Sequence, residues 1–417
     1  MNQGSVLQTV LPLAAAGLLA AVTLHGAKRV WRPSLPTEQK TMQCKATLTA
    51  GLLLGAACAA GAAFFVVYGL VSCPPPHTLE RALRYVFPSS MDAGHYISLA
   101  QYGYRAEGAE LFPSQHLMIV FFPLWPLLIR LGTALTGAGG YQVGLLWQIP
   151  LFGLAGAGLY RLTATHFGEK TARWTLAFLV TMPGSFFFAA PMTESLYLAL
   201  TVWALVCLDD ERPAAFALLG FLAALTRSTG GLLLGAAVLA ALLRWREKRP
   251  GAGWLGAALG PAAGTGVYLA LNQLVYGDPF AFVQIQRSHW AQGLGWVGDT
   301  LRYLLYYAGR WWNTDREFVC VVSLPAIVCI LWACLALFLV RRKLPVCWLA
   351  YGVAYILMAY GTTWLLSAPR YALSLPLLPL AMALLCRKNW QRRLVLVLNC
   401  TAGAVYLSEF LGWGYVY

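Results

Sequence analysis

The chain has 417 residues, of which 59% are hydrophobic and only 11% are charged. A soluble domain carries about 45–50% apolar and about 25% charged residues, so the composition excludes a soluble globular enzyme, a disordered chain and a fibrous protein. The net charge of +14 does not indicate nucleic-acid binding. The basic residues stand in short clusters between apolar runs, which is the pattern of membrane proteins.

The first apolar run, Val6 to Leu24, has no basic residue before it and three soon after it. A secretory signal has the reverse order, so we expect a retained helix with its N-terminus outside. One span needs about 20 residues, and the apolar residues suffice for about 12 spans. The later runs are 46–71, 142–160, 173–190, 195–208, 213–226, 230–243, 253–275, 317–340, 345–365, 371–386 and 394–414.

These runs predict an all-α polytopic membrane bundle that forms a single domain over residues 1–417, with the lipid bilayer as its surroundings. Basic clusters are expected on the cytoplasmic side, and they lie at 28–45, 244–249, 341–343 and 387–393. Two long loops then face outward, at 72–141 and 276–316.

One apolar segment, His116 to Leu135, does not fit this count. The chain must cross an even number of times between the first two basic clusters, and this segment would make the number odd. It contains Pro123 and Pro126, which remove backbone donors and favour a non-helical backbone that needs burial in protein. We therefore predict a re-entrant or interfacial helix within the outer loop 72–141.

The first outer loop carries a candidate catalytic acid. Asp92 stands just before a short amphipathic stretch, His95 to Tyr104, which is expected to lie on the membrane surface. The aspartate is then either a functional carboxylate at the lipid–water boundary or an ordinary helix N-cap. His95 is either part of the same site or a polar surface residue.

A second acid, Glu194, lies at an outer turn between two apolar runs. An acid at the end of a membrane helix is a candidate functional residue, and the alternative is that Thr193 and Glu194 cap the next helix. Two arginines occupy similar turns. Arg227 either binds an anion or belongs to a polar turn. Arg370 either binds a phosphate at a helix start or is an interfacial arginine beside Tyr371.

In this order the motifs resemble the GT-C-type membrane glycosyltransferases, and most closely the PIG-V-like mannosyltransferases, which include bacterial members. The first outer loop reads MDAGHYISLAQYGY and is followed by FFPLWPLLIR. The family's T-E-S-L, T-R-S-x-G and R-Y motifs match Thr193–Leu196, Thr226–Gly230 and Arg370-Tyr371. Met91 stands where the family has tryptophan, and Leu99 where it has isoleucine.

The resemblance implies that a sugar, usually mannose, passes with inversion from a polyprenyl-phosphate carrier to an acceptor hydroxyl. Asp92 is then the general base, and we assign Glu194 to the catalytic site as a second acidic group that orients the acceptor or the base. His95 and Tyr96 would shape the sugar site. Arg227 and Arg370, with Tyr371 beside them, would bind the carrier phosphate. The expected setting is the outer face of a bacterial plasma membrane. The acceptor stays open between a glycolipid, a cell-wall polymer and a protein.

Physical reasoning favours the same chemistry. No inner loop is long enough for a nucleotide-binding domain, so a donor used outside should be lipid-linked. Its phosphate leaves as an anion that arginines can stabilise, and one carboxylate suffices to deprotonate the acceptor. The sequence shows no metal-binding cluster and implies no cofactor, and it leaves a divalent metal beside the acids open without requiring one. The competing interpretations are a lipid or solute transporter whose arginines line a path, and a non-catalytic subunit of a glycosylating complex.

Overall fold

A computed structural model describes residues 3–30 and 44–416, so Arg32 and Lys40 of the basic cluster at 28–45 lie outside the described residues. The regular secondary structure of the described part is helical, with one isolated bridge between Leu294 and Thr362. In chain order the elements are α1 (Gln3–Val30), α2 (Cys44–Ser72), α3 (Leu79–Val86), α4 (Asp92–Tyr102), η1 (Gln115–Val120), α5 (Leu124–Thr136), α6 (Gly140–Phe167), α7 (Glu169–Thr181), η2 (Ser185–Ala189), α8 (Glu194–Asp209), α9 (Pro213–Ala224), η3 (Ser228–Leu232), α10 (Leu233–Arg246), α11 (Ala252–Tyr276), α12 (Ala281–His289), α13 (Val297–Trp311), α14 (Arg316–Phe318), η4 (Val319–Ser323), α15 (Leu324–Val340), α16 (Val346–Ala359), α17 (Ala368–Leu373), α18 (Leu377–Leu385) and α19 (Asn389–Leu411).

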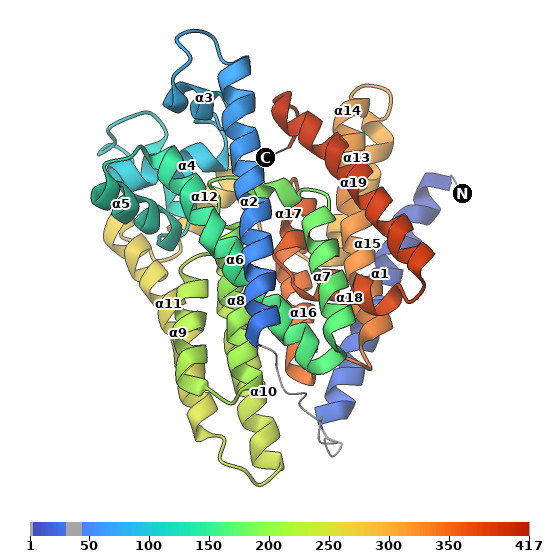
Figure 1. Ribbon diagram of the computed structural model, residues 1–417. Helices are drawn as coiled ribbons and strands as arrows, with labels where there is room; N and C mark the ends of the chain where they lie inside the picture. The colour runs from blue at the N-terminus through green and yellow to red at the C-terminus, as the bar shows by residue number, and fades with distance from the viewer. Residues whose placement is uncertain (1–2, 31–43, 417) are drawn as a thin grey trace.

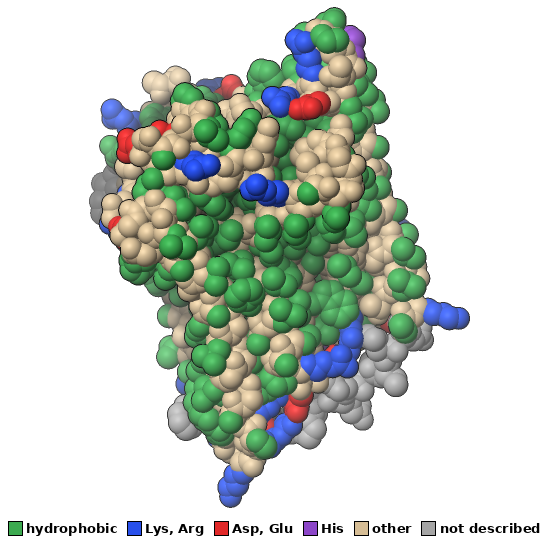
Figure 2. All heavy atoms as spheres, turned by 90° about the vertical axis from the view of Figure 1, so that its left-hand side faces the viewer, with side chains coloured by type: hydrophobic (Ala, Val, Ile, Leu, Met, Phe, Trp, Pro, Cys, Tyr) green, Lys and Arg blue, Asp and Glu red, His purple; other side chains and the backbone are tan. Residues whose placement is uncertain are grey.

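Seven of the described helical segments are long and apolar enough to cross a membrane. They correspond to α1, α2, α6, η3 with α10, α11, α14 to α15, and α19. Their apolar side chains form a broad band, with charged residues gathered above and below it (Figure 2). The chain is therefore an all-helical, multi-pass membrane protein, as its composition predicts.

The shorter helix α8 lies at the centre of the bundle. Nearly all of its residues are buried, and it packs against both α6 and α9. A helix that is apolar on every side is stable only when other protein or lipid surrounds it. Because its neighbours supply that surrounding, 16 residues suffice here.

Three of the helical hairpins are interrupted by irregular turns. The chain breaks between α7 and α8 at η2, between α9 and α10 at η3, and between α16 and α18 at α17. The run 371–386, expected as one span, is thus divided, because α18 begins only after Pro376. Irregular backbone at this depth must be buried in protein, and these turns carry Glu194, Arg227 and Arg370.

The two predicted outer loops fold into helices at one end of the bundle (Figure 1). The loop 72–141 supplies α3, α4, η1 and α5, and the loop 276–316 supplies α12 and α13. The segment 116–135 is divided into η1 and α5 by a break at Phe121–Pro123. The 13 residues of α5 extend about 20 Å, less than the roughly 30 Å hydrocarbon core. That this segment does not cross the membrane stays a prediction.

Candidate functional site

Asp92 is the first residue of α4, one position further into the helix than an N-cap. Met91 occupies the cap, and no side chain makes a capping hydrogen bond there. The helix begins close to the preceding turn because Gly94 has no side chain. A Cβ at Gly94 would lie 2.6 Å from the carbonyl oxygen of Pro88. The carboxylate of Asp92 instead accepts a hydrogen bond from Nη1 of Arg370, so it is not used as a helix cap.

Glu194 is the first residue of α8 and is completely buried. Its Oε1 accepts hydrogen bonds from Nη2 of Arg227 and from Nε of Arg370. Its Oε2 is buried and has no hydrogen-bond partner among the described residues. The N-cap residue Thr193 makes no side-chain cap either, because its hydroxyl accepts from Nε of Arg227 at 2.8 Å. The pair thus binds arginine rather than capping the helix.

Arg227 is held through all three of its side-chain nitrogens. Besides Thr193 and Glu194, it donates through Nη1 to the hydroxyl of Ser374 at 2.8 Å. Its guanidinium lies 5.7 Å from the ring centre of Tyr197, and that of Arg370 lies 5.5 Å from the ring centre of Phe187. Such cation–π contacts favour a charged guanidinium in a desolvated place. Both guanidinium groups are therefore held in one orientation and in their charged form.

These four residues, Asp92, Arg370, Glu194 and Arg227, form a charge ladder in which the signs alternate. They come from four elements that are distant in sequence: α4, α17, α8 and the turn before η3. Buried charges need partners of opposite sign, because desolvating an isolated ion costs several kcal/mol. The ladder has no net charge, which allows it to be buried without a ligand.

The ladder is most open at Asp92, while Arg227 at its other end is 13% exposed. The side chain of Asp92 is 31% exposed, whereas those of Arg370 and Glu194 are 5% and 0% exposed. Partial burial raises the pKa of Asp92, but the positive charge and hydrogen bond of Arg370, together with the charge of Arg227, outweigh that effect and hold its pKa below the usual range. Asp92 is therefore an ionised carboxylate that an outside molecule can reach.

The predicted sugar-site residues lie on the same helix as Asp92. The rings of His95 and Tyr96 each lie 5.1 Å from the ring of Phe121. Burial lowers the pKa of His95, and the charge of Asp92 opposes that shift only in part, so the imidazole is neutral at pH 7. Tyr371 follows Arg370 in α17, and its carbonyl oxygen accepts from the hydroxyl of Tyr355 at 2.9 Å.

The proline-rich segment that begins at Phe121 supports the backbone of the site. The amide of Leu124 donates to the carbonyl of Leu225 at 3.0 Å, two residues before Arg227. The indole of Trp125 donates to the carbonyl of Pro191 at 3.0 Å, three residues before Glu194. The segment therefore positions two turns of the ladder. Among the described residues, no group of three or more His, Cys, Asp or Glu is placed to hold a metal ion.

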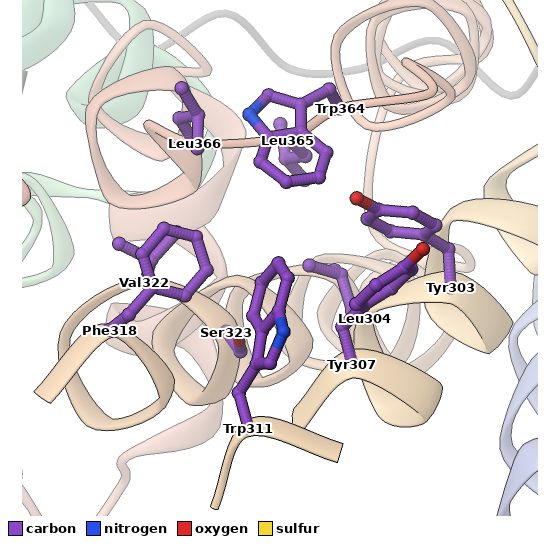
Figure 3. Close-up of a pocket in the computed structure, with 10 residues that line it drawn as sticks. All are labelled: Tyr303, Leu304, Tyr307, Trp311, Phe318, Val322, Ser323, Trp364, Leu365 and Leu366. Carbon is purple, nitrogen blue, oxygen red and sulfur yellow. The ribbon is translucent and has the colours of Figure 1, made fainter. Parts of the chain in front are cut away.

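A hollow lined largely by aromatic rings lies between α13, the start of the α14–α15 span and the segment 364–366 (Figure 3). The cavity itself is small, about 10 Å³, which is room for about one water molecule. Tyr303, Tyr307 and Trp311 repeat along one face of α13 with a spacing of four residues, and Trp364 lies across from them. The segment 364–366 continues directly into the turn that carries Arg370.

Fold and site together define a class: a multi-pass helical membrane protein with a buried, charge-balanced ladder that opens at Asp92. Comparison of the chain with protein-family models, with curated proteins and with solved structures finds no match. The function is therefore argued from the site itself.

Proposed function

We propose that the protein is a glycosyltransferase of the GT-C type that moves a sugar, in the first instance mannose, from a polyprenyl-phosphate carrier to an acceptor hydroxyl. The observation that carries the proposal is the charge ladder with Asp92 at its open end. It combines an accessible carboxylate with largely buried arginines. Transfer of a sugar from a lipid phosphate requires both kinds of group.

In this reaction the acceptor oxygen attacks C1 of the sugar, a new C–O bond forms, and the bond between C1 and the phosphate oxygen breaks. The bonding electrons leave with the phosphate, and the acceptor proton passes to Asp92. A phosphate is already a good leaving group, so the carboxylate as base is sufficient. Arg370 is the ladder cation next to Asp92, where it can stabilise the developing phosphate charge.

The proposed setting is the outer leaflet of a bacterial plasma membrane, with about twelve crossings. The seven long spans would be joined by the shorter α7, α8, α9 and α16 and by α17 with α18, which neighbouring helices shield. The basic cluster at 244–249 begins in the last turn of α10, and Glu194 opens the opposite end of the neighbouring hairpin. Cytoplasmic placement of basic clusters then puts the ladder outside.

The aromatic hollow would contact the first isoprene units of the carrier through the residues around it, because it is too small to enclose them. Its lining is almost entirely apolar, with leucine and valine beside the aromatic rings. It is adjacent in sequence to the Arg370 turn, so a carrier whose phosphate lies at the arginines has its chain close to this surface. Apolar burial of each methylene contributes about 0.8 kcal/mol.

The test is sugar transfer in proteoliposomes supplied with polyprenyl-phosphate-mannose labelled in the sugar and with extracted membrane lipids and polymers. Asp92→Asn keeps the size of the side chain and removes the base, so transfer should fall at least about 10²-fold. Asp299→Asn is the matched control, because Asp299 is an exposed acid in α13 that pairs with Arg302; its transfer rate should equal that of the wild type.

Equal transfer by Asp92→Asn and wild type would overturn the assignment of the base. Bound donor without transfer by the wild type would contradict the choice of mannose or of the acceptors offered. Movement of the intact donor across the vesicle membrane, with no transfer, would favour a transporter. Transfer that appears only after a second protein is added would favour a subunit role.

A further inference from the structure

Arg370 is shared between two carboxylates of different character. Its Nε donates to Glu194, which is fully buried, and its Nη1 donates to Asp92, which is partly exposed. The carboxylate that the proposed reaction uses as base is thus occupied as an ion-pair partner. A carboxylate held by a guanidinium is a weaker base, because the positive charge favours its ionised form.

We propose that the carrier phosphate displaces Asp92 from Arg370, so that donor binding itself releases the general base. This inference rests on the proposed function and assigns a regulation to the same site. In the protein without donor, Asp92 neutralises Arg370. With donor, the phosphate takes over that role and Asp92 turns to the acceptor hydroxyl.

The contacts of the ladder restrict this exchange to one place. Arg227 is fixed by Thr193, Ser374 and Glu194. Arg370 keeps its bond to Glu194 and its position near the ring of Phe187 when Nη1 is released. The bond between Asp92 and Arg370 is the ladder contact with the most accessible partner, since Asp92 is 31% exposed and Arg227 is 13% exposed. An incoming anion therefore competes with Asp92 rather than with Glu194.

Glu194 is a positioning residue in this scheme. Two arginines converge on its Oε1, and without that negative charge their mutual repulsion would separate them. Glu194 thus keeps Arg370 at the site during the exchange. The reaction increases the negative charge on the bound phosphate. The donor phosphodiester carries one negative charge, whereas the released monoester carries about −1.5 to −2. Asp92, protonated after transfer, returns to Arg370 once it has lost its proton and the carrier has left.

Asp92 is faced by charged and titratable groups from several elements. These are Arg370 and Tyr371 of α17, Arg227, Glu194 of α8, and His95 and Tyr96 of its own helix. The two other helices that pack against α4 contribute the exposed Arg130 of α5 and the buried Tyr141 of α6. Of the cations, Arg370 has the largest effect on the Asp92 pKa, so its loss as a partner should dominate the change on donor binding.

The experiment compares two pH profiles of the wild-type protein in proteoliposomes. The acidic limb of kcat/KM reports the pKa of the base in the free protein, and that of kcat reports it in the donor complex. The donor phosphodiester stays ionised over this range and contributes no limb. Because an arginine partner lowers a carboxylate pKa by about 1–3 units, the limb of kcat should lie about 1–3 pH units above that of kcat/KM. Coincident limbs would overturn the proposal.

Two variants distinguish a specific coupling between donor binding and Asp92 from a general loss of activity. In Arg370→Gln both limbs should coincide at the higher pH, because nothing holds Asp92 before the donor arrives. Arg227→Gln is the matched control, since Arg227 contacts Glu194 but donates to Thr193 and Ser374 rather than to Asp92. It should transfer sugar more slowly and still show separated limbs. Coincident limbs in Arg227→Gln would assign the effect to the ladder as a whole and contradict a specific role of Arg370. Repeating the profiles in His95→Asn removes the titration of that imidazole.

A second measurement needs no turnover. Difference infrared spectroscopy of the purified protein, titrated with acid with and without polyprenyl phosphate, follows the carboxyl band that Asp92→Asn removes. The midpoint should rise when the lipid phosphate is present. An unchanged midpoint with bound lipid overturns the coupling, even if transfer is observed. A raised midpoint in a protein that never transfers sugar would support the coupling while contradicting the proposed function.

Discussion

The two ends of α8 carry acidic residues in opposite situations. At its first residue, Glu194 is buried and binds two arginines from other parts of the chain. At its last residue, Asp209 lies 2.7 Å from Nε2 of His166, and the adjacent Asp210 pairs with Arg161 at 2.6 Å. In the second set, each acid pairs with a different base of α6. The first set joins four elements, and one oxygen is shared by two cations.

This difference distinguishes a structural pairing from a functional one. The Arg161–Asp210 pair is about a quarter exposed and lies between helices that already pack together, so either partner can turn to solvent. The charge ladder cannot do so, and burying its ions requires desolvation that their mutual attraction only partly repays. An apolar set would stabilise such a place more simply. We infer that a fold that keeps four ions there uses their charge.

The largest effect is expected from breaking the ladder at its centre. Glu194→Gln leaves Arg227 and Arg370 close together without their shared counter-charge. Removing one partner of a buried ion pair destabilises a protein by about 3–5 kcal/mol, and sugar transfer should be lost as well. Thermal unfolding of the detergent-solubilised protein measures the first effect.

The control is the double variant Glu194→Gln with Arg227→Gln, which removes one charge of each sign. It should recover part of the lost stability, since a single arginine then remains and Asp92 still pairs with it. If the double variant is as unstable as the sum of the two single changes, the two residues do not interact energetically.

A smaller effect is expected beside the ladder, in the aromatic hollow. Trp311→Ala removes a ring that contacts Tyr307 and Phe318 and lines the space. The loss should raise KM for a long-chain polyprenyl donor about tenfold, since that factor corresponds to about 1.4 kcal/mol of binding. A donor whose chain is too short to reach this aromatic surface should show no change in KM. Equal changes for both donors would place the carrier chain elsewhere.

The sequence predicts the helical, membrane-embedded character because apolar length depends on composition alone. The sequence does not locate the breaks between neighbouring helices equally well. The run 371–386 is uniformly apolar, and only Pro376 indicates that α17 and α18 are separate. Short central helices such as α8 are also hidden in the sequence, because their stability depends on neighbours that no local pattern reveals.

The site was predicted as a set of residues but not as an arrangement. Asp92, Glu194, Arg227 and Arg370 stand out because charge is rare in apolar surroundings. Their mutual pairing could not be predicted, because it joins turns that are up to 278 positions apart. The two arginines were predicted to bind a phosphate, and in the structure they pair with carboxylates. Ser374 and Trp125 gave no signal, since a serine and a tryptophan near membrane-helix ends are common.

The smallest effect is expected at the other end of α8, and it completes the comparison. Asp210→Asn removes the charge that pairs with Arg161, but the arginine remains accessible to water and its guanidinium lies 6.0 Å from the ring centre of Trp203. Partly exposed pairs contribute about 0–1 kcal/mol, so the unfolding temperature should change little. Sugar transfer should be unaffected, because the 16 residues of α8 separate this pair from the ladder by about 24 Å. A loss of transfer in Asp210→Asn, with normal stability, would instead mean that α8 couples its two ends, and the distinction between structural and functional charges would no longer hold.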